Sequence, residues 1–125
     1  MCGIAGYISK TDSPFTIEQI KKLFMDIELR GKDATGIAFV EDKKFKIMKT
    51  PQMVHELLDT NDWKSKEDTI SKSRITLLHA RAATHGSPSD NRNNHPIYNK
   101  LGVIIHNGVV YPEKVLKADG QSDSE

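Results

Sequence analysis

The chain has 125 residues, of which 37% are hydrophobic, and its 18 lysines and arginines nearly balance 17 aspartates and glutamates. This length fits one domain that buries roughly two thirds of its unfolded surface, and the near-neutral charge excludes the strong positive field that would hold a nucleic acid or an anionic membrane. One cysteine cannot form an internal disulfide, and no apolar run approaches the roughly 20 residues of a membrane span, so the sequence predicts a cytoplasmic protein.

The first predicted element is a buried strand from Gly3 to Ser9, which places Cys2 at a strand end. A helix follows, because apolar residues recur at steps of three and four along TIEQIKKLFMDIELRG. Thr16 with Gln19 predicts a capping box at its start, and Gly31 predicts a left-handed stop at its end. The stretches ATGIAFV and FKIMK, joined by the polar EDKK, predict two strands connected by a turn.

The second half continues with a short helix predicted over residues 51–59, and the polar NDWKSKEDTISKS predicts a surface loop or weak helix in which Trp63 is a local packing anchor. RITLLHARA predicts a central strand, which leads into the polar loop THGSPSDNRNNHP. IYNKLGVIIH predicts a hairpin turning at Asn99 and Lys100, and YPEKVLKA predicts a short helix. This order favours an α+β fold of antiparallel strands with helices on a face.

Cys2 stands out because removal of Met1 would leave a thiol and a free α-amine on one residue. The amine, with a pKa of about 7.7 to 8.0, can accept the proton of a thiol whose pKa is about 8.5. An N-terminal residue that uses its own amine as the general base is a known form of activated nucleophile. A lone cysteine can equally be a small buried hydrophobe.

Two further strand ends carry polar residues. Asn107 and Gly108 follow the last predicted strand, where a side-chain amide and a glycine N–H can supply two donors to an oxyanion, although Asn-Gly is also a common turn. Arg81 ends the central strand and can bind a substrate carboxylate or form a surface salt bridge. Asp123 could bind a substrate ammonium group or lie in a solvated tail.

Taken together, the stretches MCGIAGY, ELRGKDATGIAF, HARAATHGSPSDNRNNHPI, VIIHNGVV and SDSE resemble, in order and spacing, the class II glutamine amidotransferases, which are N-terminal nucleophile hydrolases. The resemblance spans essentially the whole chain and is closest to the glutaminase domains of glucosamine-fructose-6-phosphate aminotransferase and amidophosphoribosyltransferase. It implies an α+β fold with layers of antiparallel sheet and helices.

The resemblance also implies roles for individual residues. Cys2 would attack the side-chain amide of glutamine and form a glutamyl thioester, and Asn107 with Gly108 would form the oxyanion hole. The implied substrate-binding residues are Arg81 for the α-carboxylate, Asp123 for the α-ammonium group, and Thr84, His85 and Gly86 along the pocket. Arg30, Gly31 and Asp33 match the RGxD stretch and are interpreted as support for the strand that carries the nucleophile.

Two departures from the family pattern affect these expectations. Ala82 stands where aminotransferase-type members have a tryptophan, so closure over the substrate is expected to differ. The chain also stops at Glu125, directly after the implied substrate-binding aspartate, whereas the family's domain continues through more strands. We therefore expect residues 1–125 to form a glutamine amidotransferase domain that is short or incomplete at its C-terminus, and a weak glutaminase by itself.

The expected partners are glutamine, a synthase or transferase domain or subunit that accepts ammonia, and further copies of the chain; no cofactor and no metal are expected. A rival interpretation is a metal hydrolase whose ligands come from His79, His85, His95 and His106 with Asp90 or Asp123. These histidines lack HxH or HExxH spacing. A second alternative is a module that senses glutamine or scaffolds a partner without turnover, which Ala82 and the short length favour.

Overall fold

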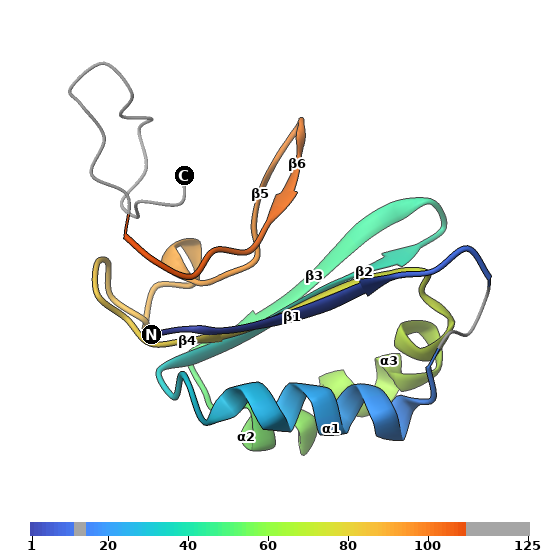
Figure 1. The fold of residues 1–125 in the computed structure, drawn as a ribbon, viewed down its shortest axis with the longest axis horizontal. Helices are drawn as coiled ribbons and strands as arrows, with labels where there is room; N and C mark the ends of the chain where they lie inside the picture. The colour runs from blue at the N-terminus through green and yellow to red at the C-terminus, as the bar shows by residue number, and fades with distance from the viewer. Residues whose placement is uncertain (12–14, 110–125) are drawn as a thin grey trace.

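The computed structural model describes residues 1–11 and 15–109, and the predicted helix in YPEKVLKA and the predicted site residue Asp123 lie outside this part. The larger sheet has the strand order β1 (Gly3–Ile8), β4 (Ile75–Arg81), β2 (Ala34–Glu41) and β3 (Lys44–Thr50). Every neighbouring pair in it is antiparallel. A separate antiparallel hairpin of β5 (Ile97–Asn99) and β6 (Gly102–Ile104) rises from one face (Figure 1). The predicted α+β class with antiparallel sheets is confirmed.

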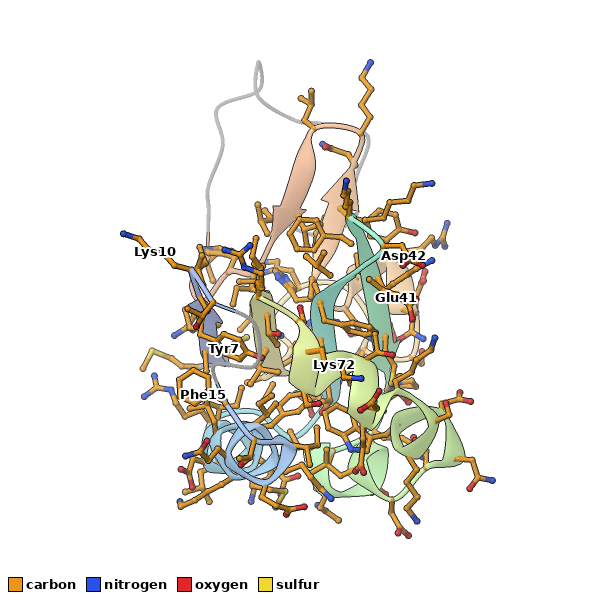
Figure 2. The ribbon with its side chains drawn as sticks, turned by 90° about the vertical axis from the view of Figure 1, so that its right-hand side faces the viewer. Tyr7, Lys10, Phe15, Glu41, Asp42 and Lys72 are labelled. Carbon is orange, nitrogen blue, oxygen red and sulfur yellow. The ribbon has the colours of Figure 1, made fainter. Side chains whose placement is uncertain are left out.

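Three helices, α1 (Ile17–Glu28), α2 (Val54–Leu58) and α3 (Asn61–Lys72), lie together on the face of the sheet opposite the hairpin (Figure 1). Their apolar side chains and those of the central strands form one buried core, as the view from the end of the sheet also shows (Figure 2). This core contains Ile20, Phe24, Ile27, Ile37, Phe39, Val54, Leu57, Trp63, Ile70, Leu78 and Ala80. Within the described residues, no helix is long and apolar enough to cross a membrane.

The capping box of α1 is confirmed. The Thr16 hydroxyl accepts the Gln19 backbone N–H at 3.2 Å, and the Gln19 side-chain oxygen accepts the Thr16 N–H at 3.0 Å. Gly31 does not provide the predicted left-handed stop, since the only described glycines with positive φ are Gly86 and Gly108. The reason for a glycine there is packing: a Cβ on Gly31 would lie 2.3 Å from the carbonyl oxygen of Ala80 on β4.

The polar stretch predicted as a loop or weak helix is the regular helix α3. Trp63 and Ile70, both fully buried, give this helix an apolar face two turns long, which the many charged residues around them conceal in the sequence. The Trp63 ring lies 5.9 Å from that of Phe24, and its indole N–H donates to Glu67 at 2.9 Å. The prediction that Trp63 is a packing anchor is confirmed.

The strand β1 was predicted to be buried, but it lies at the edge of the sheet and only one of its faces packs on α1. Ile4 and Ile8, on its other face, are 46% and 79% exposed. On the helix side, Tyr7 packs edge-to-face on Phe15, with ring centroids 4.8 Å apart (Figure 2). The β5–β6 hairpin turns at Lys100 and Leu101, one residue later than predicted, because Asn99 pairs with Gly102.

Candidate active site

Cys2 directly precedes β1 and is half-buried beside the end of β4. The backbone N–H of Ala82 lies 3.4 Å from its sulfur and donates to it, while the thiol lies 3.6 Å from the Ala82 carbonyl oxygen and can donate in return. The Arg30 side chain donates to the Cys2 carbonyl at 3.2 Å. Both the side chain and the backbone of Cys2 are therefore held in place by neighbouring segments.

The RGxD stretch contacts the same end of β4. The Asp33 N–H donates to the Arg81 carbonyl at 2.9 Å, and the Asp33 carboxylate accepts the Ala83 N–H at 2.7 Å. Gly31 allows this close approach because any side chain there would collide with Ala80. Arg30 and Asp33 thus connect this stretch to Cys2 and to the end of β4, and their role as support for a nucleophile stays a prediction.

Arg81 is 5% exposed, and its guanidinium faces the polar loop that follows β4. It donates to the Asn94 side-chain oxygen at 2.8 Å, to the Gly86 carbonyl at 2.8 Å, and to the His85 carbonyl. In this structure Arg81 therefore holds the loop that carries the predicted pocket residues Thr84, His85 and Gly86. A buried arginine with these partners differs from the exposed salt bridge that the sequence left open as an alternative.

The predicted pocket residues Thr84, His85 and Gly86 are exposed on that loop. The Thr84 hydroxyl lies 3.4 Å from Nδ1 of His85. Gly86 has a φ of 72°, and a Cβ there would lie 2.7 Å from the Asn93 side chain, so this position requires glycine. The loop is thus shaped by buried contacts, while its outer surface is accessible to a ligand.

Three histidines, which the sequence suggested only as possible metal ligands, meet behind this loop. His79 on β4 and His95 are buried, and their rings stack with centroids 4.3 Å apart. The His106 ring lies 6.4 Å from that of His95. His79 Nε2 lies 3.0 Å from the His106 carbonyl oxygen, and the His106 N–H donates to His95 Nδ1 at 3.2 Å. Among the described residues, no group of three acidic, histidine or cysteine side chains is arranged to hold a metal ion.

Burial determines whether His79 and His95 carry a charge. It lowers the pKa of His79 to about 4, although the bond to the His106 carbonyl acts in the opposite direction. Burial also lowers the pKa of His95 to about 3, with His79 and Arg81 adding electrostatic repulsion to a second positive charge. Both imidazoles are therefore neutral at pH 7. The sequence does carry a signal for this cluster. One histidine stands inside an apolar predicted strand, and two further histidines follow in later segments.

Asn107 and Gly108 follow the His106 backbone that the two histidines contact. Asn107 is half-buried and Gly108 is exposed. Gly108 has a φ of 145°, and a Cβ there would lie 3.2 Å from the His106 ring. Asp123, the last predicted substrate-binding residue, lies outside the described residues.

These contacts gather most of the predicted site residues at one end of the larger sheet. The N-terminus, the end of β4, the polar loop and the segment after β6 lie side by side there, on the left in Figure 1. β4 is the common support: Ala82, directly after it, contacts Cys2, while Arg81 contacts the loop and His79 contacts the segment that carries Asn107.

This arrangement is consistent with the class indicated by the motifs, the class II glutamine amidotransferases, and comparison with known proteins confirms the resemblance. The chain is 38% identical over 113 residues to a glutamine–fructose-6-phosphate aminotransferase (isomerizing) of Clostridium tetani, which covers 88% of this chain and 17% of that enzyme. The enzyme of the same name from Bacteroides thetaiotaomicron is 38% identical over 122 residues, covering 94% of this chain and 18% of the relative.

A more distant relative has the same name. The glutamine–fructose-6-phosphate aminotransferase (isomerizing) of Sulfolobus acidocaldarius is 32% identical over 124 residues, covering 98% of this chain and 20% of that enzyme. No family model matches the chain. The chain thus spans about a fifth of the length of the curated relatives that it matches.

Proposed function

We propose that residues 1–125 act as a glutamine amidotransferase domain that hydrolyses the side-chain amide of glutamine to glutamate and ammonia. The observation that carries this proposal is the position of Cys2, whose sulfur is held by the Ala82 backbone at the end of the sheet where the predicted pocket loop and the Asn107 segment are anchored. The relationship to enzymes named for glutamine supports the same substrate.

The proposed reaction begins after removal of Met1. The α-amine of Cys2 takes the thiol proton, and the sulfur attacks the carboxamide carbon of glutamine. The Asn107 side-chain amide and the Gly108 N–H donate to the oxyanion. The C–N bond then breaks, the amine returns its proton to the departing ammonia, and water cleaves the resulting thioester to release glutamate and restore the thiol.

In this proposal Arg81 binds the substrate α-carboxylate, Asp123 binds the α-ammonium group, and Thr84, His85 and Gly86 line the pocket. A domain with N-terminal nucleophile hydrolase layering is the corresponding fold. The released ammonia would pass to a synthase or transferase domain or subunit. Neither a metal nor a cofactor has a part in these steps, and a cytoplasmic location suits an unprotected thiol.

Chemical labelling of the thiol tests this function. The chain contains a single cysteine, so a diazoketone analogue of glutamine should add one equivalent, to Cys2, in protein whose intact mass shows that Met1 is gone. Free glutamine should slow the labelling, and Cys2→Ser should abolish both labelling and glutamate release. Active protein that retains Met1, or labelling that glutamine does not slow, would contradict the proposal.

The oxyanion hole has its own test. Asn107→Ala should lower kcat for glutamine hydrolysis by about a hundredfold or more, as removal of one oxyanion donor commonly does. The rate at which iodoacetamide alkylates Cys2 should change little, because that reaction forms no oxyanion. An unchanged kcat would remove Asn107 from the proposed site.

The alternative is a module that binds glutamine without hydrolysing it, or that scaffolds a partner. Two observations favour it: Ala82 leaves only a methyl group where aminotransferase-type members of the family have a tryptophan, and the Arg81 guanidinium already binds three loop acceptors. Calorimetry with the Cys2→Ser variant measures binding without turnover. Glutamine binding combined with no glutamate release from the wild-type chain would favour this alternative.

A further inference from the structure

The His79–His95 pair contacts both backbone polar groups of His106, the residue directly before the proposed oxyanion-hole residues. His79 lies on β4 and approaches the carbonyl of His106, while His95, from the polar loop, accepts the N–H of the same residue. Two segments distant in sequence thus fix the direction of the chain at one point. We call this arrangement of His79, His95 and the His106 backbone the histidine clamp.

The clamp defines where each imidazole carries its proton. A carbonyl oxygen can only accept, so His79 must donate from Nε2–H. The His106 N–H can only donate, so Nδ1 of His95 must be unprotonated. The hydrogen bond fixes His95 in its neutral Nε2–H tautomer. The buried Nδ1 of His79 has no hydrogen-bond partner among the described residues, and the buried stack at 4.3 Å disfavours a charge on either ring, so His79 is neutral and in its Nε2–H tautomer too.

The clamp reaches the proposed reaction through one peptide plane. The carbonyl of His106 and the N–H of Asn107 belong to the same planar unit, so the bond to His79 also sets the orientation of the Asn107 backbone. The direction in which the Asn107 side chain and the next N–H, that of Gly108, point depends on that plane. Oxyanion donors contribute most when they are held in position before the reaction.

We infer that His79 and His95 are positioning residues for the oxyanion hole: through the His106 backbone they hold Asn107 and Gly108 in the orientation that glutamine hydrolysis requires. This inference rests on the proposed function. It assigns these histidines a part in the acyl-transfer step that involves no contact with the substrate and no metal ion.

Paired substitutions at each histidine test the clamp. The Asn side chain places its amide oxygen at the same distance along the chain as Nδ1 of histidine, and the Gln side chain places its amide nitrogen at that of Nε2. His95→Asn and His79→Gln should therefore keep the acceptor and the donor, whereas His95→Leu and His79→Leu remove them. His55→Leu is the matched control, because His55 lies in α2 and contacts Glu28 instead.

We expect each leucine variant to lower kcat for glutamine about 10- to 100-fold with less than a threefold change in KM, since misplacement by about 1 Å is enough for such a loss. The Asn and Gln variants should recover most of kcat, and His55→Leu should match the wild type. Folded leucine variants with wild-type kcat would overturn the inference. Conservative variants as slow as their leucine counterparts would overturn it too.

A measurement independent of activity separates failure of the clamp from failure of the proposed function. In nuclear magnetic resonance spectra at pH 7, both rings should be in the Nε2–H tautomer, and the His106 amide should exchange slowly with solvent. Exchange should be at least tenfold faster in His95→Leu and close to wild type in His95→Asn. If the chain proves inactive but shows this pattern, the proposed function fails and the clamp geometry stands. Rapid exchange of the His106 amide in the wild type would refute the clamp itself.

If the leucine variants do not fold, the same spectra of the wild type and of the Asn and Gln variants decide whether the clamp exists.

Discussion

At the scale of a single residue, Arg81 has two roles, one proposed and one seen in the structure. The proposed function requires its guanidinium to bind a substrate carboxylate, yet in the structure it donates to Asn94 and to the carbonyls of His85 and Gly86. A guanidinium has five N–H groups in a planar fork, so one side chain can in principle serve a loop and a ligand together. The sequence identified the residue, but its buried partners could not be read from spacing alone.

The two roles of Arg81 can be separated by comparing two substitutions. Arg81→Lys keeps the charge but has no planar fork, so we expect KM for glutamine to rise about tenfold or more and stability to fall, because loop carbonyls lose their donor. Asn94→Ala leaves the guanidinium in place but removes its Asn94 acceptor and the two hydrogen bonds that the Asn94 amide donates to Pro88 and Asn91, so it should lower stability with a smaller change in KM. Steady-state kinetics and urea unfolding measure both. Equal effects of the two variants on KM would show that Arg81 acts only through the loop.

Gly31 illustrates a residue whose type is fixed by packing. In Gly31→Ala the new Cβ would lie 2.3 Å from the Ala80 carbonyl oxygen, and since that atom belongs to the backbone of β4 the strand itself would have to move. We expect the variant to lose about 1 to 3 kcal/mol of unfolding free energy. Gly102→Ala is the control, because a Cβ there meets nothing within 4 Å. Equal urea midpoints for both variants would contradict this packing argument.

At the scale of elements, a regular spacing of apolar residues predicted helices and strands correctly. Segments in which few apolar residues stand among many charged ones were predicted less well. The helix α1, the β2–β3 hairpin and the central strand β4 follow apolar patterns and were predicted with close boundaries. The helix α3 was predicted as a loop or weak helix because its buried Trp63 and Ile70 stand among charged residues, and only the tertiary contact with Phe24 reveals its apolar face. The edge position of β1 depends on pairing with β4, which no local pattern encodes.

The same contrast holds for the candidate site. Cys2, Arg81, Asn107 and Gly108 were named from chemistry and strand ends, and from the family resemblance. The histidine clamp was missed, since it depends on contacts of His79 and His95 with the backbone of His106, which lies 27 and 11 positions further along the chain. Sequence motifs can therefore indicate candidate reactive residues, but not the buried groups that hold them in place.

The start of α1 offers an element-scale prediction. Thr16→Ala removes the side-chain acceptor of the Gln19 N–H and should destabilise the chain by about 1 kcal/mol. Thr16→Ser keeps the hydroxyl and should lose much less. Thermal unfolding followed by circular dichroism would compare them. If the alanine variant is as stable as the wild type, the capping box contributes nothing to the fold in solution.

At the scale of the whole molecule, the histidine clamp links the fold to pH. Titratable or charged groups near the two rings are Arg81 on β4, His106, and Lys49 on β3, whose ammonium donates to the carbonyls of Asn94 and Pro96 on either side of His95. These positive or ionisable neighbours and the burial of both rings favour neutral imidazoles in the folded chain. Unfolding releases His79 and His95 into water, where each takes up a proton near the usual histidine pKa of about 6.5.

The pH dependence of stability follows from that difference. Between about pH 4.5 and 6.5 the unfolded chain binds more protons than the folded chain, because the folded pKa values are about 4 for His79 and about 3 for His95. The free energy of unfolding is therefore highest above pH 6.5 and falls as the pH is lowered, and each histidine contributes up to about 1.4 kcal/mol per pH unit to this slope.

Urea unfolding at half-unit intervals of pH would measure how steeply the free energy of unfolding changes with pH. In the double variant His79→Gln, His95→Asn, which keeps the polar contacts but cannot titrate, the slope in this window should be markedly shallower. If the two slopes are equal, the pair is not buried in its neutral form, and the physical basis assigned here to the clamp is wrong.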